Sequence, residues 1–208
     1  MARIIVLNHL TLDGVMQAPG RPDEDPRGGF GHGGWAQLHS DPAVMAAMGQ
    51  ELADAGPYLF GRRSYENFAA FWPHQTDGNP YTESLDRNQK YVASRTLTEP
   101  LRWENSTVLA GDAAESVAAL KERETKDLVV FGSGDLLRTL MQHHLVDVYV
   151  LMIHPVVLGT GRRMFPDDAT RSELRLNRAV TAASGVIIAT YHPADAAVAS
   201  RGQGGATR

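Results

Sequence analysis

Three short segments of this chain combine glycine, arginine and hydroxyl side chains, and each follows a stretch with the pattern of a strand. They are Gly61-Arg62-Arg63-Ser64, Ser94-Arg95-Thr96 and Gly132-Ser133-Gly134. Arginine binds phosphate through charge-assisted hydrogen bonds, and the free amides at the start of a helix also bind anions. Glycine lets the backbone turn without placing a side chain against a ligand. One elongated ligand with several phosphates explains the three segments better than three separate sites do.

The cations indicate that this ligand is NADPH rather than NADH. Arg62, Arg63 and Arg95 offer positive charge for a 2′-phosphate, and no acidic residue follows a dinucleotide fingerprint to bind a ribose hydroxyl. The segment Gly29-Phe30-Gly31-His32-Gly33-Gly34 does match G-x-G-x-x-G. It is rejected as a fingerprint, because prolines and acidic residues precede it where a strand is required.

The composition excludes several other functions. The chain has 208 residues, no cysteine and a net charge of -4, and it contains no basic stripe and no long apolar span. Disulfides, cysteine nucleophiles and cysteine zinc sites are therefore excluded, and neither nucleic acid nor a membrane is an expected partner. The eight histidines show no metal-ligand spacing, so we expect no metal site. With no signal peptide in the pattern, we expect a cytoplasmic protein.

The elements that would position these segments alternate between strand and helix. Leu128 to Phe131 is a short continuous apolar run, typical of a strand buried on both faces, and an amphipathic helix follows from Asp135 to His144. Such alternation predicts a mostly parallel sheet with helices on both faces. Other expected strands are 3–10, 58–60, 88–93, 107–110 and 145–157, and other expected helices are 41–55 and 112–121.

The two ends of the chain have a different pattern. Residues 174–182 and 186–191 are strand-like and are joined by Ala183-Ser184-Gly185, which predicts a C-terminal antiparallel hairpin. Residues 194–208 are rich in Ala and Gly, and we expect a flexible tail after a domain of residues 1–193. Residues 18–34 are rich in Pro, Gly and charge and are expected to form a long loop or lid.

Two residues near this loop are candidate catalytic residues with alternative interpretations. Asp13, in the turn Asp13-Gly14, either acts directly in the chemistry or caps backbone amides. Trp35, just after the loop, either stacks on a flat substrate or nicotinamide ring or packs the loop against the protein.

The segment 127–165 resembles the dihydrofolate-reductase-like family. The resemblance rests on the strand, the Gly132-Ser133-Gly134 turn, the helix, Leu145-Val146-Asp147, the long strand, and then Pro155 to Gly161 with Phe165. It covers residues 2–193 and is closest to the reductase domain of bacterial riboflavin biosynthesis and its stand-alone relatives. It implies a three-layer α/β fold and an NADPH-dependent reductase. The implied substrate is a small heterocycle such as a pterin, a pyrimidine or a ribosylaminopyrimidine.

The resemblance also assigns roles to residues and implies a homodimer that pairs through the C-terminal half. The long apolar segment 145–157 would otherwise expose a strand edge, so we expect it to take part in this pairing. The resemblance places Asn8, His9 and Met16 beside the nicotinamide and the substrate, and we expect the backbone from Phe131 to Leu136 to lie against the pyrophosphate. Dihydrofolate reductases carry a carboxylate on the helix after the lid, whereas the pattern around Asp41 is that of a helix cap. The expected cofactor-binding residues are Asn8, Met16, Gly61, Arg62, Arg63, Ser64, Ser94, Arg95, Thr96, Phe131, Gly132, Ser133, Gly134, Asp135 and Leu136.

Two other classes of function fit the same residues. The first is a protein that binds NADPH without turning it over, since no proton donor is identified. The second is an unrelated α/β binding module whose glycine turns are only turns.

Overall fold

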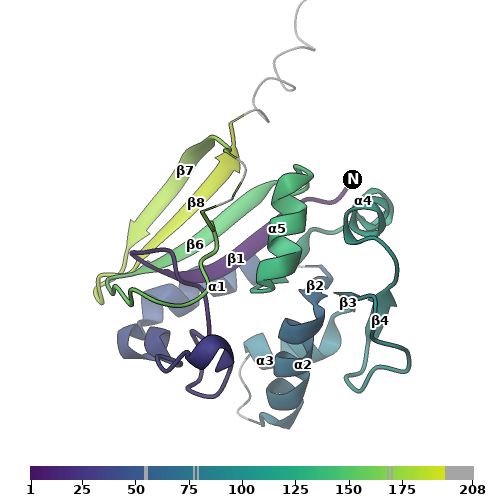
Figure 1. Ribbon diagram of the computed structural model, residues 1–208, viewed down its shortest axis with the longest axis horizontal. Coiled ribbons are helices and arrows are strands. Elements are labelled where there is room, and N and C mark those ends of the chain that lie inside the picture. The colour runs from purple at the N-terminus through teal and green to yellow at the C-terminus, as the bar shows by residue number, and fades with distance from the viewer. Residues whose placement is uncertain (54–55, 77, 79, 168, 170, 195–208) are drawn as a thin grey trace, which may run out of the picture.

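The computed structural model describes residues 1–53, 56–76, 78, 80–167, 169 and 171–194. Within these residues the chain forms one eight-stranded sheet in the order β4-β3-β2-β5-β1-β6-β8-β7 (Figure 1). The tail expected beyond Ala194 lies outside the described residues. The strands are β1 (Ile4–Thr11), β2 (Tyr58–Gly61), β3 (Lys90–Ala93), β4 (Ser106–Leu109), β5 (Leu128–Phe131), β6 (Val148–His154), β7 (Leu174–Thr181) and β8 (Ile187–Pro193).

The direction of the strands confirms the predicted sheet. Neighbouring strands from β4 to β6 pair in parallel, whereas β8 is antiparallel to both β6 and β7. All four residues of β5 are buried, because this strand lies between β2 and β1 and helices cover both of its faces. A strand in that position needs a continuous apolar sequence, as Leu128 to Phe131 has.

The position of β6 corrects one expectation. The apolar segment 145–157 was expected to present a strand edge for pairing with a second copy. Instead β6 lies inside the sheet between β1 and β8, and its apolar residues are used within the chain. The edge strand on that side of the sheet is β7, beyond β8, and its Leu176 is 51% exposed.

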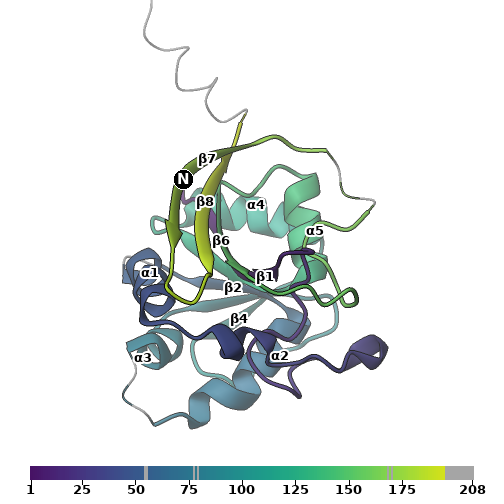
Figure 2. The ribbon, with the colours of Figure 1, turned by 90° about the vertical axis from the view of Figure 1, so that its left-hand side faces the viewer.

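Helices cover the sheet on both sides, which confirms the three-layer architecture. On one side α4 and α5 pack over Leu128 and Val130, and on the other side α1, α2 and α3 pack over Val129 and Phe131. Figure 2 shows α4 and α5 on one side of β2, and α2 and α3 on the other. The helices are α1 (Pro42–Ala53), α2 (Arg62–Phe71), α3 (Pro80–Arg87), α4 (Ala113–Arg123) and α5 (Gly134–Gln142).

The loop at residues 18–34 is held in place by its own hydrogen bonds. The side-chain amide of Gln17 donates to the carbonyls of Asp25 and Arg27, each at 3.0 Å. Phe30 is buried in a small apolar cluster beneath the loop. The glycine-rich segment 29–34 follows the short 3-10 helix η1 (Arg27–Gly29) and not a strand, which agrees with its rejection as a dinucleotide fingerprint.

Among the described residues, no helix has both the length and the apolar character needed to cross a membrane.

Candidate functional site

The three glycine, arginine and hydroxyl segments lie next to one another, because β3, β2 and β5 are parallel neighbours in the sheet. The guanidinium of Arg62 donates a hydrogen bond of 2.7 Å to Thr96 Oγ1, which joins the turn after β2 to the turn after β3. The amide of Gly61 donates to Ser133 Oγ at 2.8 Å, which joins the turn after β2 to the turn after β5. The segments form one continuous edge at the carboxyl ends of the strands.

The turn after β5 also contacts β1. The amide of Gly132 donates to Asn8 Oδ1 at 2.8 Å, so β1 joins the same row. Gly132 and Ser133 both have positive φ, 57° and 64°, which lets the chain turn sharply before α5 begins at Gly134. No side chain caps α5, so the amides of its first turn lack partners within the helix. These amides and the helix dipole make this position favourable for an anion.

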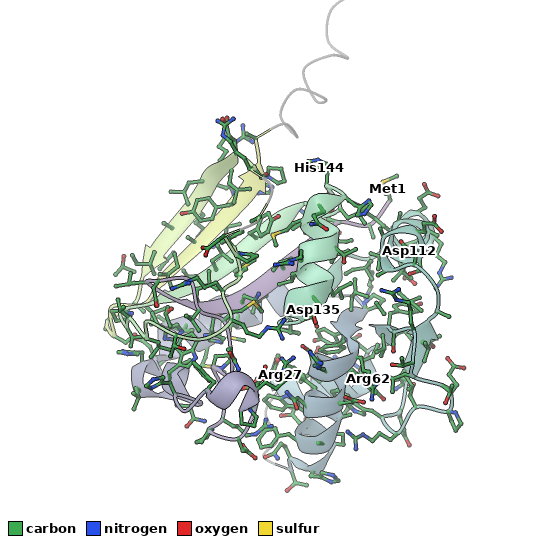
Figure 3. All side chains as sticks on the ribbon, viewed as in Figure 1. Met1, Arg27, Arg62, Asp112, Asp135 and His144 are labelled. Carbon is green, nitrogen blue, oxygen red and sulfur yellow. The ribbon has the colours of Figure 1, made fainter. Side chains whose placement is uncertain are left out.

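A cleft of about 1450 Å³ opens along this row. Typical ligand pockets measure about 300–1,000 Å³, so the cleft has room for a cofactor together with a substrate. Figure 3 shows three charged residues that line it, Arg27, Arg62 and Asp135, on three different elements. All fifteen residues expected to bind the cofactor line this cleft: Asn8, Met16, Gly61, Arg62, Arg63, Ser64, Ser94, Arg95, Thr96, Phe131, Gly132, Ser133, Gly134, Asp135 and Leu136.

The charges along the cleft are partly paired. Asp135 accepts a hydrogen bond of 2.8 Å from Arg162, and Arg63 lies 3.7 Å from its other oxygen. Arg62 pairs with Glu66 on the next turn of α2 at 2.9 Å. Arg95 is exposed and forms no ion pair with any residue that the structure describes. These pairs are solvent-exposed and contribute little to folding stability, so their arginines can bind an anion at small cost.

At the other end of the cleft the structure brings together three histidines from distant parts of the chain. His9 on β1 and His154 on β6 form a hydrogen bond of 2.8 Å between Nδ1 and Nε2. The His39 ring, from the 3-10 helix η2 (Trp35–His39), lies 5.8 Å from the His154 ring. All three line the cleft. Sequence spacing could not identify this cluster, because only the pairing of β1 with β6 places two of its members together.

The environment keeps the paired histidines neutral. Burial, and then the neighbouring His154, lowers the pKa of His9 to about 3. Burial, and then the neighbouring His39, lowers the pKa of His154 to about 4. Both rings are therefore uncharged at neutral pH. Among the described residues, no group of three His, Asp or Glu side chains is placed to hold a metal ion.

Two carboxylates, Asp41 and Glu24, line the cleft and differ in their surroundings. Both oxygens of Asp41 are engaged, since the amides of Ala43 and Ser184 donate to them at 2.7 and 2.8 Å. Asp41 is thus a cap for α1, as its sequence pattern predicts. Burial raises the pKa of the Glu24 carboxyl, although two amides of its own loop donate to Oε2. Glu24, which sequence reasoning missed, is the better candidate for an acid.

An aromatic wall lines the cleft beside the loop that carries Glu24, whose carbonyl accepts a hydrogen bond from Asn67 of α2. Arg21, on the same loop as Glu24, places its guanidinium 4.4 Å from the centre of the Phe71 ring. Flat apolar rings of this kind suit a flat heterocyclic ligand, because aromatic pairs stack or meet edge to face. The wall consists of Phe68, Phe71, Trp72 and Tyr81.

The residues predicted to be catalytic, Asp13 and Trp35, do not line the cleft. The carboxylate of Asp13 accepts hydrogen bonds from Thr11 Oγ1 at 2.6 Å and from the amides of Leu158 and Gly159 at 3.2 and 2.8 Å. The hydrogen bond from Thr11 is the main cause that lowers the Asp13 pKa. Asp13 therefore connects its turn to the loop after β6, which is the capping alternative.

Trp35 has the packing role of its two alternatives. It is 3% exposed, and its indole Nε1 donates to the carbonyl of Gln17 at 2.8 Å. It packs with Val15 and Phe30 in the apolar cluster beneath the loop. The Trp35 and His154 rings also meet edge to face with their centres 5.2 Å apart, so Trp35 packs against the histidine cluster.

Comparison with known proteins gives a consistent result. The family model of the RibD C-terminal domain matches residues 2–188. The uncharacterized protein YyaP of Bacillus subtilis strain 168 is 31% identical over 196 residues, which is 91% of this chain and 94% of YyaP.

Solved structures of other proteins have the same fold. A protein from Shewanella sp. PV-4, provisionally assigned to riboflavin biosynthesis, is 20% identical, with a TM-score of 0.65. The alignment covers 93% of this chain and 99% of the Shewanella chain. Dihydrofolate reductase from Enterococcus faecalis, solved with NADP(H), is 14% identical, with a TM-score of 0.59. The alignment covers 93% of this chain and 97% of the reductase chain.

Proposed function

We propose, from the premise that this chain belongs to the family of RibD C-terminal domains, that it is an NADPH-dependent reductase of a small heterocyclic substrate. The observation that carries the proposal is the hydrogen-bonded row of turns after β3, β2, β5 and β1. This row combines arginines, hydroxyls and helix amides along one cleft. An elongated ligand with several phosphates is the chemistry that such a row suits.

The residues of the cleft fit such a cofactor. Arg62, Arg63 and Arg95 would hold the 2′-phosphate, and Arg95 has no competing ion pair among the described residues. The first-turn amides of α5, beginning at Gly134, would hold the pyrophosphate, since no side chain caps that helix. The carboxylate of Asp135 is offset by Arg162 and Arg63, so it does not leave a bare negative charge at this place.

Bound NADPH would supply the hydride, and the protein would orient the two reactants and exclude water. Asn8 belongs to the row of turns and precedes His9 on β1, and Met16 lines the same cleft, so a nicotinamide ring beside Asn8 and Met16 would meet a substrate near the histidines. The ordered loop that carries Glu24 closes one side of the cleft. Glu24 would hold the proton that a C=N or C=O group needs when it accepts a hydride.

The proposed substrate is a pterin, a pyrimidine or a ribosylaminopyrimidine-like heterocycle, and the proposed pathway is riboflavin biosynthesis. The aromatic wall would stack against such a flat ring. A panel of these heterocycles, followed by the absorbance of NADPH, tests turnover. Consumption of NADPH with one of them supports a reductase. Saturable NADPH binding without consumption across the panel would favour the non-catalytic NADPH-binding alternative.

The role of the arginines is tested with Arg62→Ala and a matched control, Arg123→Ala, which removes an exposed cation from the last turn of α4 outside the cleft. Loss of one charge-assisted hydrogen bond costs about 1.5–3 kcal/mol, so Arg62→Ala should weaken NADPH binding about tenfold or more. NADH lacks the 2′-phosphate and should be affected much less, and the control should bind both as the parent does. Equal losses for NADPH and NADH would mean that Arg62 has a structural role or that the phosphate is misplaced.

A further inference from the structure

In the histidine pair at the substrate end, each ring has one nitrogen outside the shared hydrogen bond, and these two nitrogens have different surroundings. His9 Nδ1 and His154 Nε2 are joined at 2.8 Å. The remaining nitrogen of His154, Nδ1, is fully buried and has no partner. The remaining nitrogen of His9, Nε2, has no partner among the described residues either, but His9 is only half-buried and lines the cleft.

Which nitrogen carries the proton follows from this asymmetry. Two neutral rings share one hydrogen bond, so either both carry the proton on Nδ1 or both carry it on Nε2. The first arrangement buries an N–H of His154 without an acceptor, and buried unpaired N–H groups are rare in proteins. The second leaves only a bare His154 nitrogen without a donor, and the Nε2–H form is also the favoured tautomer of neutral histidine in water. His154 Nε2–H therefore donates to His9 Nδ1, and His9 carries its own proton on Nε2.

We propose that His9 Nε2–H is a fixed hydrogen-bond donor to the substrate, and that it selects a heterocycle presenting a carbonyl oxygen at that point. The proposal rests on the proposed reductase function, because it assumes that the substrate occupies this end of the cleft. His154 acts as a positioning residue, since it fixes the His9 tautomer without facing the ligand through a free nitrogen.

The surroundings explain why the donor stays neutral and oriented. The centre of the His154 ring lies 5.2 Å from that of Trp35 and 5.8 Å from that of His39, so His154 is packed between two other rings. The nearby Asp41 is already bonded to two amides and does not draw a proton onto the histidines. A neutral donor discriminates by hydrogen-bond polarity, because a ligand that presents an N–H there leaves two donors facing each other.

The first test needs no ligand. Nitrogen-15 NMR of the histidine rings at neutral pH reports which nitrogen carries the proton, and His9→Gln and His154→Gln assign the signals. We expect both rings in the Nε2–H form. Protonation on Nδ1, or a charged ring at neutral pH, would overturn the proposal.

The second test uses two probes that differ in one group. Isocytosine has a ring carbonyl, and 2,4-diaminopyrimidine has an amino group in its place. Each is titrated into NADPH-saturated protein at mildly alkaline pH, where both probes are neutral. Isocytosine should bind about three- to tenfold more tightly than diaminopyrimidine and should shift the His9 ring signal. Equal affinities, or an unmoved His9 signal, would overturn the proposal.

Two variants of His9 separate the donor from the fold. His9→Gln places an amide near the position of Nε2 and should keep the preference for isocytosine. His9→Asn places an amide near the position of Nδ1, can still bond His154, and should lose the preference. An unchanged preference in a folded His9→Asn would contradict the assignment. Failure of the parent protein to bind NADPH would instead refute the proposed function, whereas NADPH binding without a probe preference would refute only this inference.

Discussion

Replacing Gly134 by alanine separates cofactor binding from folding at the start of α5. The backbone of Gly134 does not have positive φ, and a methyl group there would have Met16 Sδ as its nearest atom, at 3.9 Å. That is an ordinary contact, so no strain is expected. Alanine in a helix is favoured over glycine by about 0.5–1 kcal/mol, so stability should be unchanged or slightly higher. For a chain of this size the melting temperature should rise by at most about 2–4 °C.

The same methyl group would lie where the pyrophosphate is proposed to approach the helix amides. Losing one charge-assisted hydrogen bond costs about 1.5–3 kcal/mol, so NADPH affinity should fall about tenfold or more. Gly132→Ala is the contrasting variant. It has φ of 57° and would place Cβ 3.3 Å from Ser64 Oγ, so it should also lose about 1–3 kcal/mol of stability.

The assay combines thermal melts with NADPH titration of both variants. Gly134→Ala should melt at or above the parent temperature and bind NADPH weakly. A well-folded Gly134→Ala with the parent's affinity would refute the pyrophosphate assignment, and the turn would then serve folding alone.

Three other predictions concern the stability of the protein at acidic pH, the pH dependence of turnover and the oligomeric state. The pKa of His9 is lowered from 6.5 to about 3, and the pKa of His154 from 6.5 to about 4. The contribution of each neutral ring to folding stability is therefore complete above 6.5, the pKa in the unfolded chain, and is lost as the pH falls below that value. Urea unfolding at about pH 5 should show a loss of about 2 kcal/mol for each ring, and His9→Gln should remove one of these contributions; a flat profile in the parent would contradict it. Glu24→Gln should slow turnover and remove the decline in rate above the raised pKa of Glu24, whereas an unchanged pH profile would exclude Glu24 as the acid. The chain should form a homodimer through the β7 edge, so Leu176→Glu should elute as a monomer in size-exclusion chromatography with light scattering, and a monomeric parent would refute pairing.

The sheet was predictable because its central strands have sequences that suit only a buried position. Leu128 to Phe131 is apolar throughout, and in the structure all four residues are buried between helices. The neighbours of each strand were less accessible to sequence reasoning. The segment 145–157 has the apolar character of an interior strand and equally that of a pairing edge, and only the return of β8 shows which is correct.

The row of turns after β3, β2, β5 and β1 was predictable because its residues follow their strands directly. Parallel strands place their carboxyl ends at one edge, so Arg62, Arg95 and Gly132 were expected to lie near each other, and they line one cleft. The histidine cluster was not predictable, because His154 reaches His9 only through the register in which Thr11 pairs with His154. For Asp13, the chain that returns at Leu158 and Gly159 supplies the amides that it caps, and local sequence does not reveal that return.

The position of NADPH along the row of turns can be measured by titrating NADPH into nitrogen-15-labelled protein and following the backbone amides. We expect saturable shifts in three places at once: residues 61–64, residues 94–96 and residues 132–136. NADH should move the last group with weaker effects on the first two. Absence of saturable shifts, or shifts concentrated at β7 away from the cleft, would contradict binding along this row.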